Sequence, residues 1–211
     1  MRQFITDANG KPLVVYRGEH GDNDGIEEGA FIQSRLGSIS FGSIESANIY
    51  AMTPNNLLDE IKAPRIIPAK LIIENPIVSD EHDPFIDFTI LSEAIGEANA
   101  TKAFIKYEDE IINTNNWEEN FGKRYMSIKE MIDAEPDKLQ SLYIDAYHLL
   151  DDPAIVEKLI AAGFDGAIHG GNGITAYETE YKVFNIDQIV SAYAITPTPE
   201  IEKAQNKMMT I

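Results

Sequence analysis

The 211-residue chain has no cysteine, a single tryptophan and no long run of apolar residues. The lack of cysteine excludes disulfides and thiolate metal sites and fits a reducing compartment. No apolar stretch approaches the roughly 20 residues that a membrane-spanning helix needs. The N-terminus, Met-Arg-Gln-Phe-Ile-Thr-Asp, also lacks the apolar segment of a secretory signal. We therefore expect a cytoplasmic protein with no membrane partner.

Basic residues are also scarce, with 17 Lys and Arg against 35 Asp and Glu, which gives a formal net charge of -18. This charge opposes non-specific binding to nucleic acid and to anionic membranes, so we expect a protein partner instead. Apolar residues make up 44% of the chain, which predicts a globular domain with a sizeable core.

Strand patterns stand at both ends of the chain. Near the N-terminus we expect a hairpin over 5–17 with its turn at 7–10, a short strand over 38–41, and a strand pair over 66–73 and 76–80. Within that pair, Pro68 predicts a sheet edge or a bulge. Near the C-terminus we expect three strands, over 165–168, 180–184 and 188–194.

Two helices have clear ends in this sequence. Ser43 is a typical N-cap for a helix through Met52, with Glu45 in its first turn. Asp152-Pro153 begins a second helix and Gly163 ends it. Its apolar spacing predicts the buried stripe Val156, Leu159 and Ile160.

Residues 81–150 have helical spacing instead, as in the sets Leu91, Ile95, Ala98 and Tyr125, Ile128, Met131, Ile132. We expect one α+β domain over 1–211, with a helical insertion at about 81–150 and a short tail over 197–211. Trp117 and Phe121 in the insertion either anchor it to the core or mark a wall of a ligand cleft. In the second case, Glu118 and Glu119 would dock a partner protein.

The pair Glu178-x-Glu180 opens one of the predicted strands. Residues two apart on a strand project from the same face, so both carboxylates would point toward the glycine loop over 170–176. Paired carboxylates suit a substrate that develops positive charge. The alternative is a solvated strand face, and Glu108-x-Glu110 repeats the spacing in a predicted helix.

Other motifs predict little chemistry. Glu81-His-Asp83 is a polar triplet of a kind usually solvated in a loop, so no metal is expected. Gly170-Gly-Asn-Gly173 lacks the Lys-Ser/Thr ending of a phosphate-binding loop. His20, His148 and His169 have no nucleophile at a diagnostic spacing.

Three segments resemble the ADP-ribosyltransferase-like domains of phage and mobile-element polyvalent proteins. They are Asp7-Ala-Asn-Gly-Lys-Pro-Leu-Val-Val-Tyr-Arg-Gly18, then Ser38-Ile-Ser-Phe-Gly42 with the helix that carries Ala47 and Tyr50, and finally 159–168 with Glu180-Tyr-Lys-Val-Phe-Asn-Ile-Asp-Gln-Ile189. The similarity covers roughly the first 80 and the last 50 residues, but not the block over 81–150.

The resemblance implies a split β-sheet core and a mono-ADP-ribosyltransferase of the Arg–Ser–Glu type. Such an enzyme would use NAD as its substrate, need no metal, and modify a host protein, with arginine as the favoured acceptor. The resemblance assigns catalysis to Glu180 and Glu178, and NAD binding to Arg17, Gly18, Ser38, Ser40 and Phe41.

The residue types suit that chemistry. Cleavage of the nicotinamide–ribose bond develops an oxocarbenium-like cation, which the Glu180 carboxylate would stabilise. Arg17 offers a planar cationic fork for the pyrophosphate, and Ser38 a hydroxyl that would orient the glutamate. Phe41 would stack on nicotinamide or belong to the core. Two alternatives stay open: an NAD glycohydrolase toxin, in which water replaces the acceptor, and a non-catalytic interaction module.

Overall fold

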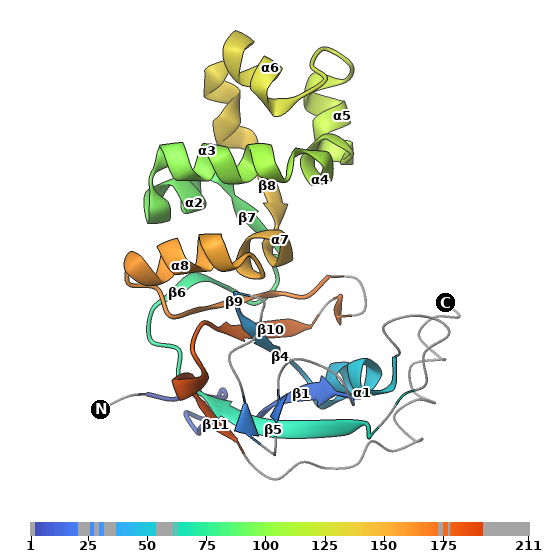
Figure 1. Cartoon of the computed structure of the whole chain (residues 1–211), viewed down its shortest axis with the longest axis vertical. Helices are drawn as coiled ribbons and strands as arrows, with labels where there is room; N and C mark the ends of the chain where they lie inside the picture. The colour runs from blue at the N-terminus through green and yellow to red at the C-terminus, as the bar shows by residue number, and fades with distance from the viewer. Residues whose placement is uncertain are drawn as a thin grey trace.

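The computed structural model describes residues 3–20, 26–27, 30–31, 37–53, 61, 63–172, 175–176 and 178–191. It has the α+β composition that the sequence predicts, with two sheets at one end of the molecule and a helical block at the other (Figure 1). The predicted tail over 197–211 lies outside the described residues, as do residues 192–194 of the last predicted strand. Within the described part of the chain, no helix is long and apolar enough to cross a membrane.

The first sheet has three antiparallel strands in the order β1 (Val15–Glu19), β5 (Arg65–Leu71) and β11 (Ile189–Ser191). The predicted N-terminal hairpin lies beside it, because the Ile5 amide donates to Leu71 O and the Leu13 amide donates to Ile5 O, both at 2.9 Å. The Asp7 carboxylate closes the turn by accepting from the amides of Asn9 and Lys11.

The second sheet has the order β4 (Ile39–Phe41), β10 (Thr179–Val183), β9 (Gly166–Gly170) and β6 (Pro76–Asp80). Its pairs are antiparallel except for β6 and β9, which are parallel. Two further strand pairs are short: β2 (Ile26–Glu27) with β3 (Ala30–Phe31), and β7 (Phe85–Asp87) with β8 (Tyr143–Asp145).

The predicted pairing of 66–73 with 76–80 is wrong, because β5 and β6 belong to different sheets. The Asp165 carboxylate accepts from the amides of Glu74 and Asn75, both at 2.8 Å, and so fixes the crossing from one sheet to the other. Pro68 has a described strand partner on one side only. It lies in the middle strand of its sheet, opposite Tyr16 of β1, and the described part of β11 pairs only with residues 69–71.

The two sheets share one apolar layer. Buried side chains from both sheets form it: Val15, Ile39, Phe41, Ala69, Leu71, Ile73 and Val183. Because strand side chains alternate, the neighbours of Ile39 and Val183 along their strands, Ser40 and Lys182, project from the opposite face of the second sheet. That face lies toward α7 (Ala146–Leu150) and α8 (Pro153–Ala161).

Helix α8 begins and ends as predicted. The Asp152 carboxylate accepts from the Ala154 amide at the N-terminus, and Gly163 has a φ of 97° just beyond the C-terminus. The predicted buried stripe is partly wrong, because the side chain of Ile160 is 49% exposed. Ile155 is buried in its place, since the helix turns its face with Ile155, Val156 and Leu159 toward the core.

Helix α1 (Ile44–Met52) packs on β1 and is capped by Ser43, whose hydroxyl accepts from the Ser46 amide, as the sequence predicts. The contact is close at Gly18. A Cβ atom built there would stand 1.8 Å from Ala47 O and 2.8 Å from Ala51 N. Glycine at this position is therefore required for the helix to lie against the strand.

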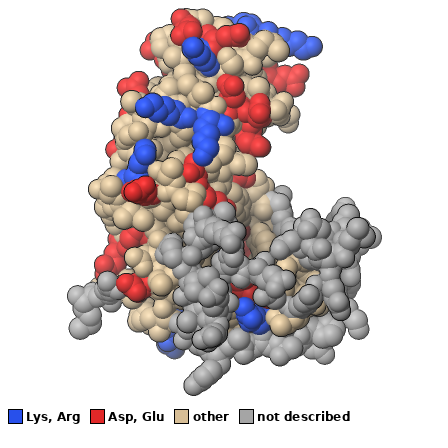
Figure 2. Space-filling view, in the orientation of Figure 1, with Lys and Arg blue, Asp and Glu red and all other residues tan. Residues whose placement is uncertain are grey.

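The helical block contains short helices rather than a few long ones. They are α2 (Phe88–Ile95), α3 (Glu97–Lys106), α4 (Glu108–Ile112), α5 (Asn115–Phe121), α6 (Ile128–Ala134) and the 3-10 helix η1 (Pro136–Ser141); a second 3-10 helix, η3 (Ile186–Gln188), precedes β11. Gly96 separates α2 from α3, so the expected stripe Leu91, Ile95, Ala98 is interrupted and Ala98 is exposed. Figure 2 shows Lys and Arg side chains interspersed with Asp and Glu over this block.

Trp117 and Phe121 act as anchors, as the first of the two interpretations expects. Both are 3% exposed, their ring centroids lie 4.6 Å apart, and they belong to one apolar cluster that also contains Leu159, Ala167 and Phe184. Helix α5 lies at the end of the molecule remote from the sheets (Figure 1). The alternative that the insertion over 81–150 forms a cleft wall and docks a partner through Glu118 and Glu119 stays a prediction.

Candidate functional site

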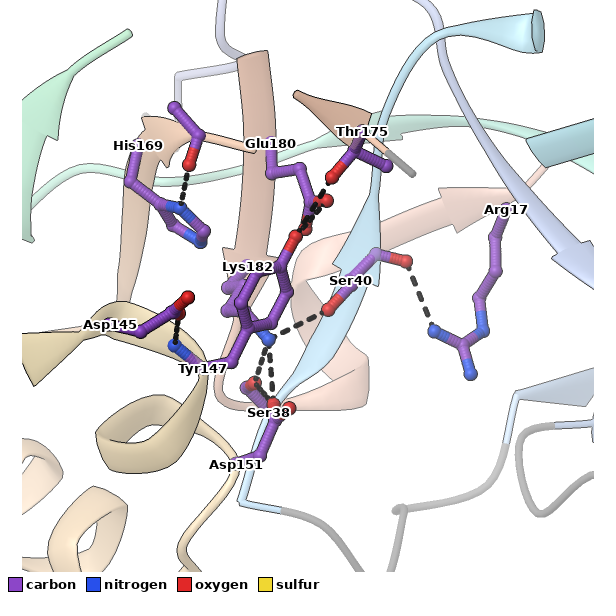
Figure 3. Close-up of polar contacts among 11 residues, drawn as sticks. Arg17, Ser38, Ser40, Asp145, Tyr147, Asp151, His169, Thr175, Glu180 and Lys182 are labelled. Atoms are coloured by element: carbon purple, nitrogen blue, oxygen red, sulfur yellow. Dashed lines mark hydrogen bonds and ion pairs between the residues drawn. The ribbon is translucent and has the colours of Figure 1, made fainter. Parts of the chain in front are cut away.

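Segments far apart in the sequence bring polar side chains together beside the second sheet (Figure 3). Ser40 lies in β4 and Ser38 directly precedes that strand. Glu180 and Lys182 come from β10, and His169 comes from β9. Glu180 stands directly opposite His169 in the antiparallel register. Tyr147, on α7, and Asp151, its C-cap, approach the same group of residues.

Glu180 is 3% exposed and therefore almost fully buried. The Tyr147 hydroxyl donates to Glu180 Oε1, and the same hydroxyl lies 3.0 Å from Thr175 Oγ1. Thr175 is 1% exposed and donates to Asn172 O at 3.0 Å. The carboxylate thus has a partner that was not expected from the sequence, since Tyr147 lies within the block over 81–150.

Glu178 lies just before β10 and has different partners. The hydroxyls of Ser43 and Ser46 both donate to Glu178 Oε2, the first at 2.5 Å. These serines occupy the N-terminus of α1, where the helix dipole favours a negative charge. Each of the two predicted carboxylates is therefore held by its own set of donors, rather than both by a single set.

The Arg17 side chain extends from β1 of the first sheet to β4 of the second. Its Nε donates to Glu19 Oε1, and Nη1 donates to Ser40 O at 3.1 Å. The Arg17 side chain is 21% exposed, whereas that of Glu19 is fully buried, and Glu19 Oε2 has no hydrogen-bond partner among the residues described. Arg17 is thus oriented by Glu19 and linked to the edge strand that carries Ser40.

Lys182 is a fully buried cation that the sequence analysis missed. Its ammonium donates to Asp151 Oδ1 at 2.6 Å, to Ser40 Oγ at 2.9 Å and to Ser38 Oγ at 3.4 Å. It also lies 4.7 Å from the ring centroid of Tyr147. These contacts neutralise the charge and join β4, β10 and α7.

The expected role of Ser38 in orienting the glutamate is wrong. Ser38 Oγ donates to Asp151 Oδ1 at 3.0 Å and contacts Lys182, so its hydroxyl is engaged away from Glu180. Phe41 is 2% exposed and packs in the apolar layer between the sheets. Gly18 faces α1, because its missing side chain admits the Ala47 carbonyl.

Tyr50, on α1, is an exposed aromatic residue, with 45% of its surface accessible. Partial burial raises the pKa of its hydroxyl, and the charges of Glu180 and Asp151 raise it further, while Arg17 acts in the opposite direction. The ring therefore stands within electrostatic reach of the predicted residues Arg17 and Glu180.

Burial shifts two other groups near Glu180. It raises the pKa of the Tyr147 hydroxyl, and the charge and hydrogen bond of Glu180 add to that effect. It lowers the pKa of His169, whose side chain is fully buried with Nδ1 2.7 Å from Gly170 O. Nε2 of His169 has no hydrogen-bond partner among the described residues. Tyr147 and His169 are thus both neutral near pH 7, with Tyr147 a donor to Glu180.

Among the residues that the structure describes, the remaining motifs gather no metal-binding group. Among the described residues, no group of three or more His, Asp or Glu side chains has a geometry that could hold a metal ion. The Glu81-His-Asp83 triplet is exposed, and the His82 amide is bonded to the Asp80 carboxylate. Gly173 and Ile174 of the glycine loop lie outside the described residues.

Comparisons of the chain with protein-family models, with curated proteins and with solved structures gave no significant match.

Proposed function

We propose that this protein is a mono-ADP-ribosyltransferase that cleaves NAD and transfers ADP-ribose to a protein side chain, on an ADP-ribosyltransferase-like split-sheet core. One observation carries the proposal. Arg17, the Ser38–Ser40 strand and Glu180, which lie far apart in the sequence, stand on neighbouring strands, with Arg17 Nη1 bonded to Ser40 O at 3.1 Å. Their order and residue types are those of the resemblance.

Glu180 would provide the charge that cleavage needs. A fixed carboxylate in a site with little water stabilises a developing oxocarbenium ion far more than an exposed one. In this role the hydrogen bond from Tyr147 would hold the carboxylate in one orientation. Since the leaving nicotinamide is neutral, the ring nitrogen accepts the bonding electrons and the positive charge passes to the ribose.

Arg17 would bind the pyrophosphate of NAD, and Tyr50 would bind its nicotinamide ring. The guanidinium, held by Glu19 and Ser40 O, offers a rigid cation for the pyrophosphate. The exposed ring of Tyr50 offers a flat apolar surface on which nicotinamide could stack. Phe41 is buried in the apolar layer, so Tyr50 suits the stacking role better.

Glu178 would serve the acceptor. Its separate set of donors, Ser43 and Ser46, supports a role distinct from that of Glu180. A carboxylate fixed at the start of α1 would bind an incoming guanidinium and assist its loss of a proton as the new bond forms.

Labelled NAD tests this division. Purified protein is incubated with NAD labelled in the adenylate part and with a host lysate, and both nicotinamide release and protein labelling are measured. The wild type is expected to do both, whereas Glu178→Gln is expected to lose labelling of arginine and keep much of the hydrolysis. Equal loss of both activities would contradict separate roles, and nicotinamide release without labelling would indicate a glycohydrolase.

A non-catalytic interaction module is the second candidate, and a specific observation favours it. Glu180 is only 3% exposed, and its Oε1 is already bonded to Tyr147. If no NAD cleavage is seen and NAD does not bind in a calorimetric titration, this second function replaces the first.

A further inference from the structure

The residue that holds Glu180 comes from outside the segments that carry the resemblance. Tyr147 lies on α7, which follows β8 at the return of the chain from the helical block. The Tyr147 hydroxyl is the hydrogen-bond donor to the Glu180 carboxylate, and it lies 3.0 Å from Thr175 Oγ1. The expected donor, Ser38, is bonded elsewhere.

The position of Tyr147 is fixed on several sides. Its own amide donates to Asp145 Oδ1 at the start of α7, and its ring meets that of His169 edge-on at a centroid distance of 5.5 Å. The Lys182 ammonium lies 4.7 Å from its ring centroid on another side. A phenol packed in this way has little rotational freedom. It therefore favours one orientation of the carboxylate that accepts its hydrogen bond.

The same segment also holds the loop that carries Thr175. Asn172 Nδ2 donates to Asp145 Oδ2 at 2.5 Å, and the Thr175 hydroxyl donates to Asn172 O at 3.0 Å. The loop is closely packed at Gly171, where a Cβ atom would stand 2.2 Å from Thr175 O. Glu180, Asn172 and Thr175 are thus all hydrogen-bonded to Asp145 or Tyr147.

We infer that Tyr147 is a positioning residue for Glu180 and that the chain following the helical block completes the active site. This inference rests on the proposed function. Helices α2 to α6 then have an indirect role in activity, because they pack against the segment that fixes the carboxylate. Removal of one hydrogen bond to a charged group changes a rate by about tenfold to a hundredfold.

Tyr147→Phe and Tyr125→Phe form a matched pair for the test. Tyr125 also donates its hydroxyl to a carboxylate, Glu135 Oε1, but in the helical block. In NAD cleavage, Tyr147→Phe should lower kcat about tenfold to a hundredfold and leave KM within about threefold, because orientation matters more in the transition state than in NAD binding. Tyr125→Phe should change neither constant.

A second measurement does not depend on activity. With ¹³C-labelled glutamate at pH 7, the carboxyl resonance of Glu180 should move in Tyr147→Phe and stay in place in Tyr125→Phe. An unmoved resonance, or an unchanged kcat in an active enzyme, would overturn the positioning role. If the wild type releases no nicotinamide but the resonance moves, the proposed enzymatic function fails while Tyr147 remains the group that orients Glu180.

Discussion

At the scale of single residues, the site contains both a buried ion pair and a buried neutral histidine. Lys182 and Asp151 form a pair, and the hydroxyls of Ser38 and Ser40 complete the contacts of the ammonium. His169 differs, because its buried Nε2 has no partner in the part of the chain that the structure describes. Desolvation favours the neutral imidazole, and the nearby Lys182 charge acts in the same direction.

The pH dependence of stability tests the state of His169. Its pKa in the folded chain lies below the ordinary value of 6.5, so the unfolded chain binds more protons as the pH falls past 6.5. The free energy of unfolding should therefore decrease on acidification, by up to about 1.4 kcal/mol per pH unit from this residue alone. Urea denaturation from pH 8 to pH 5 should show a smaller decrease in His169→Asn than in the wild type. Parallel curves for the two proteins would contradict a buried neutral His169.

The sequence contains a local signal for some of the residues around the two glutamates but not for others. Alternation along β10 placed a charged residue two positions after Glu180, and Lys182 could have been found from that spacing. Tyr147 could not, because its hydrogen bond to Glu180 joins residues 33 apart and no local pattern encodes such a contact. The serine partners of Glu178 lie still farther away, at separations of 135 and 132 residues.

At the scale of elements, the contact between α1 and β1 sets the geometry around the site. The helix carries Ser46 and Tyr50, begins after Ser43, and lies on the strand that carries Arg17. The close approach depends on Gly18, whose missing side chain makes room for Ala47 O. A displaced helix would move Ser43 and Ser46 away from Glu178.

Gly18→Ala is expected to destabilise the fold. The added methyl group would stand 1.8 Å from Ala47 O, a backbone atom that can move only with the helix. Forcing extra volume into such a contact costs about 1–3 kcal/mol or more, seen as a lower urea midpoint. Gly42→Ala is the matched control, because its Cβ would have the Ser46 side chain as its nearest neighbour at 3.7 Å. Equal midpoints for the two variants would contradict the packing role of Gly18.

The elements themselves were predicted best where their ends carry a capping residue. Ser43, Asp152 and Gly163 each act as the sequence indicated. The pairing of strands was predicted less well. The prediction assumed that strands adjacent in sequence pair in space, as they usually do. Here the Asp165 carboxylate, 90 residues from Asn75, fixes the crossing between the sheets instead.

At the scale of the whole molecule, one apolar cluster connects the helical block to the second sheet. It extends from Trp117 and Phe121 through α8 to Ala167 and Phe184. The sequence predicted that the block packs, but not that its return through β8 and α7 would bring Tyr147 to Glu180. The sheets, the block and the candidate site are therefore parts of a single packed structure.

The release of nicotinamide from NAD by the wild type and by Glu180→Gln tests the central claim most directly. The substitution keeps the shape of the side chain and removes the charge that would stabilise the cation. The wild type should release nicotinamide, and Glu180→Gln should release it at least about 100-fold more slowly, with an unchanged circular dichroism spectrum. Near-normal release by the folded Glu180→Gln protein, or none by the wild type, would contradict the account.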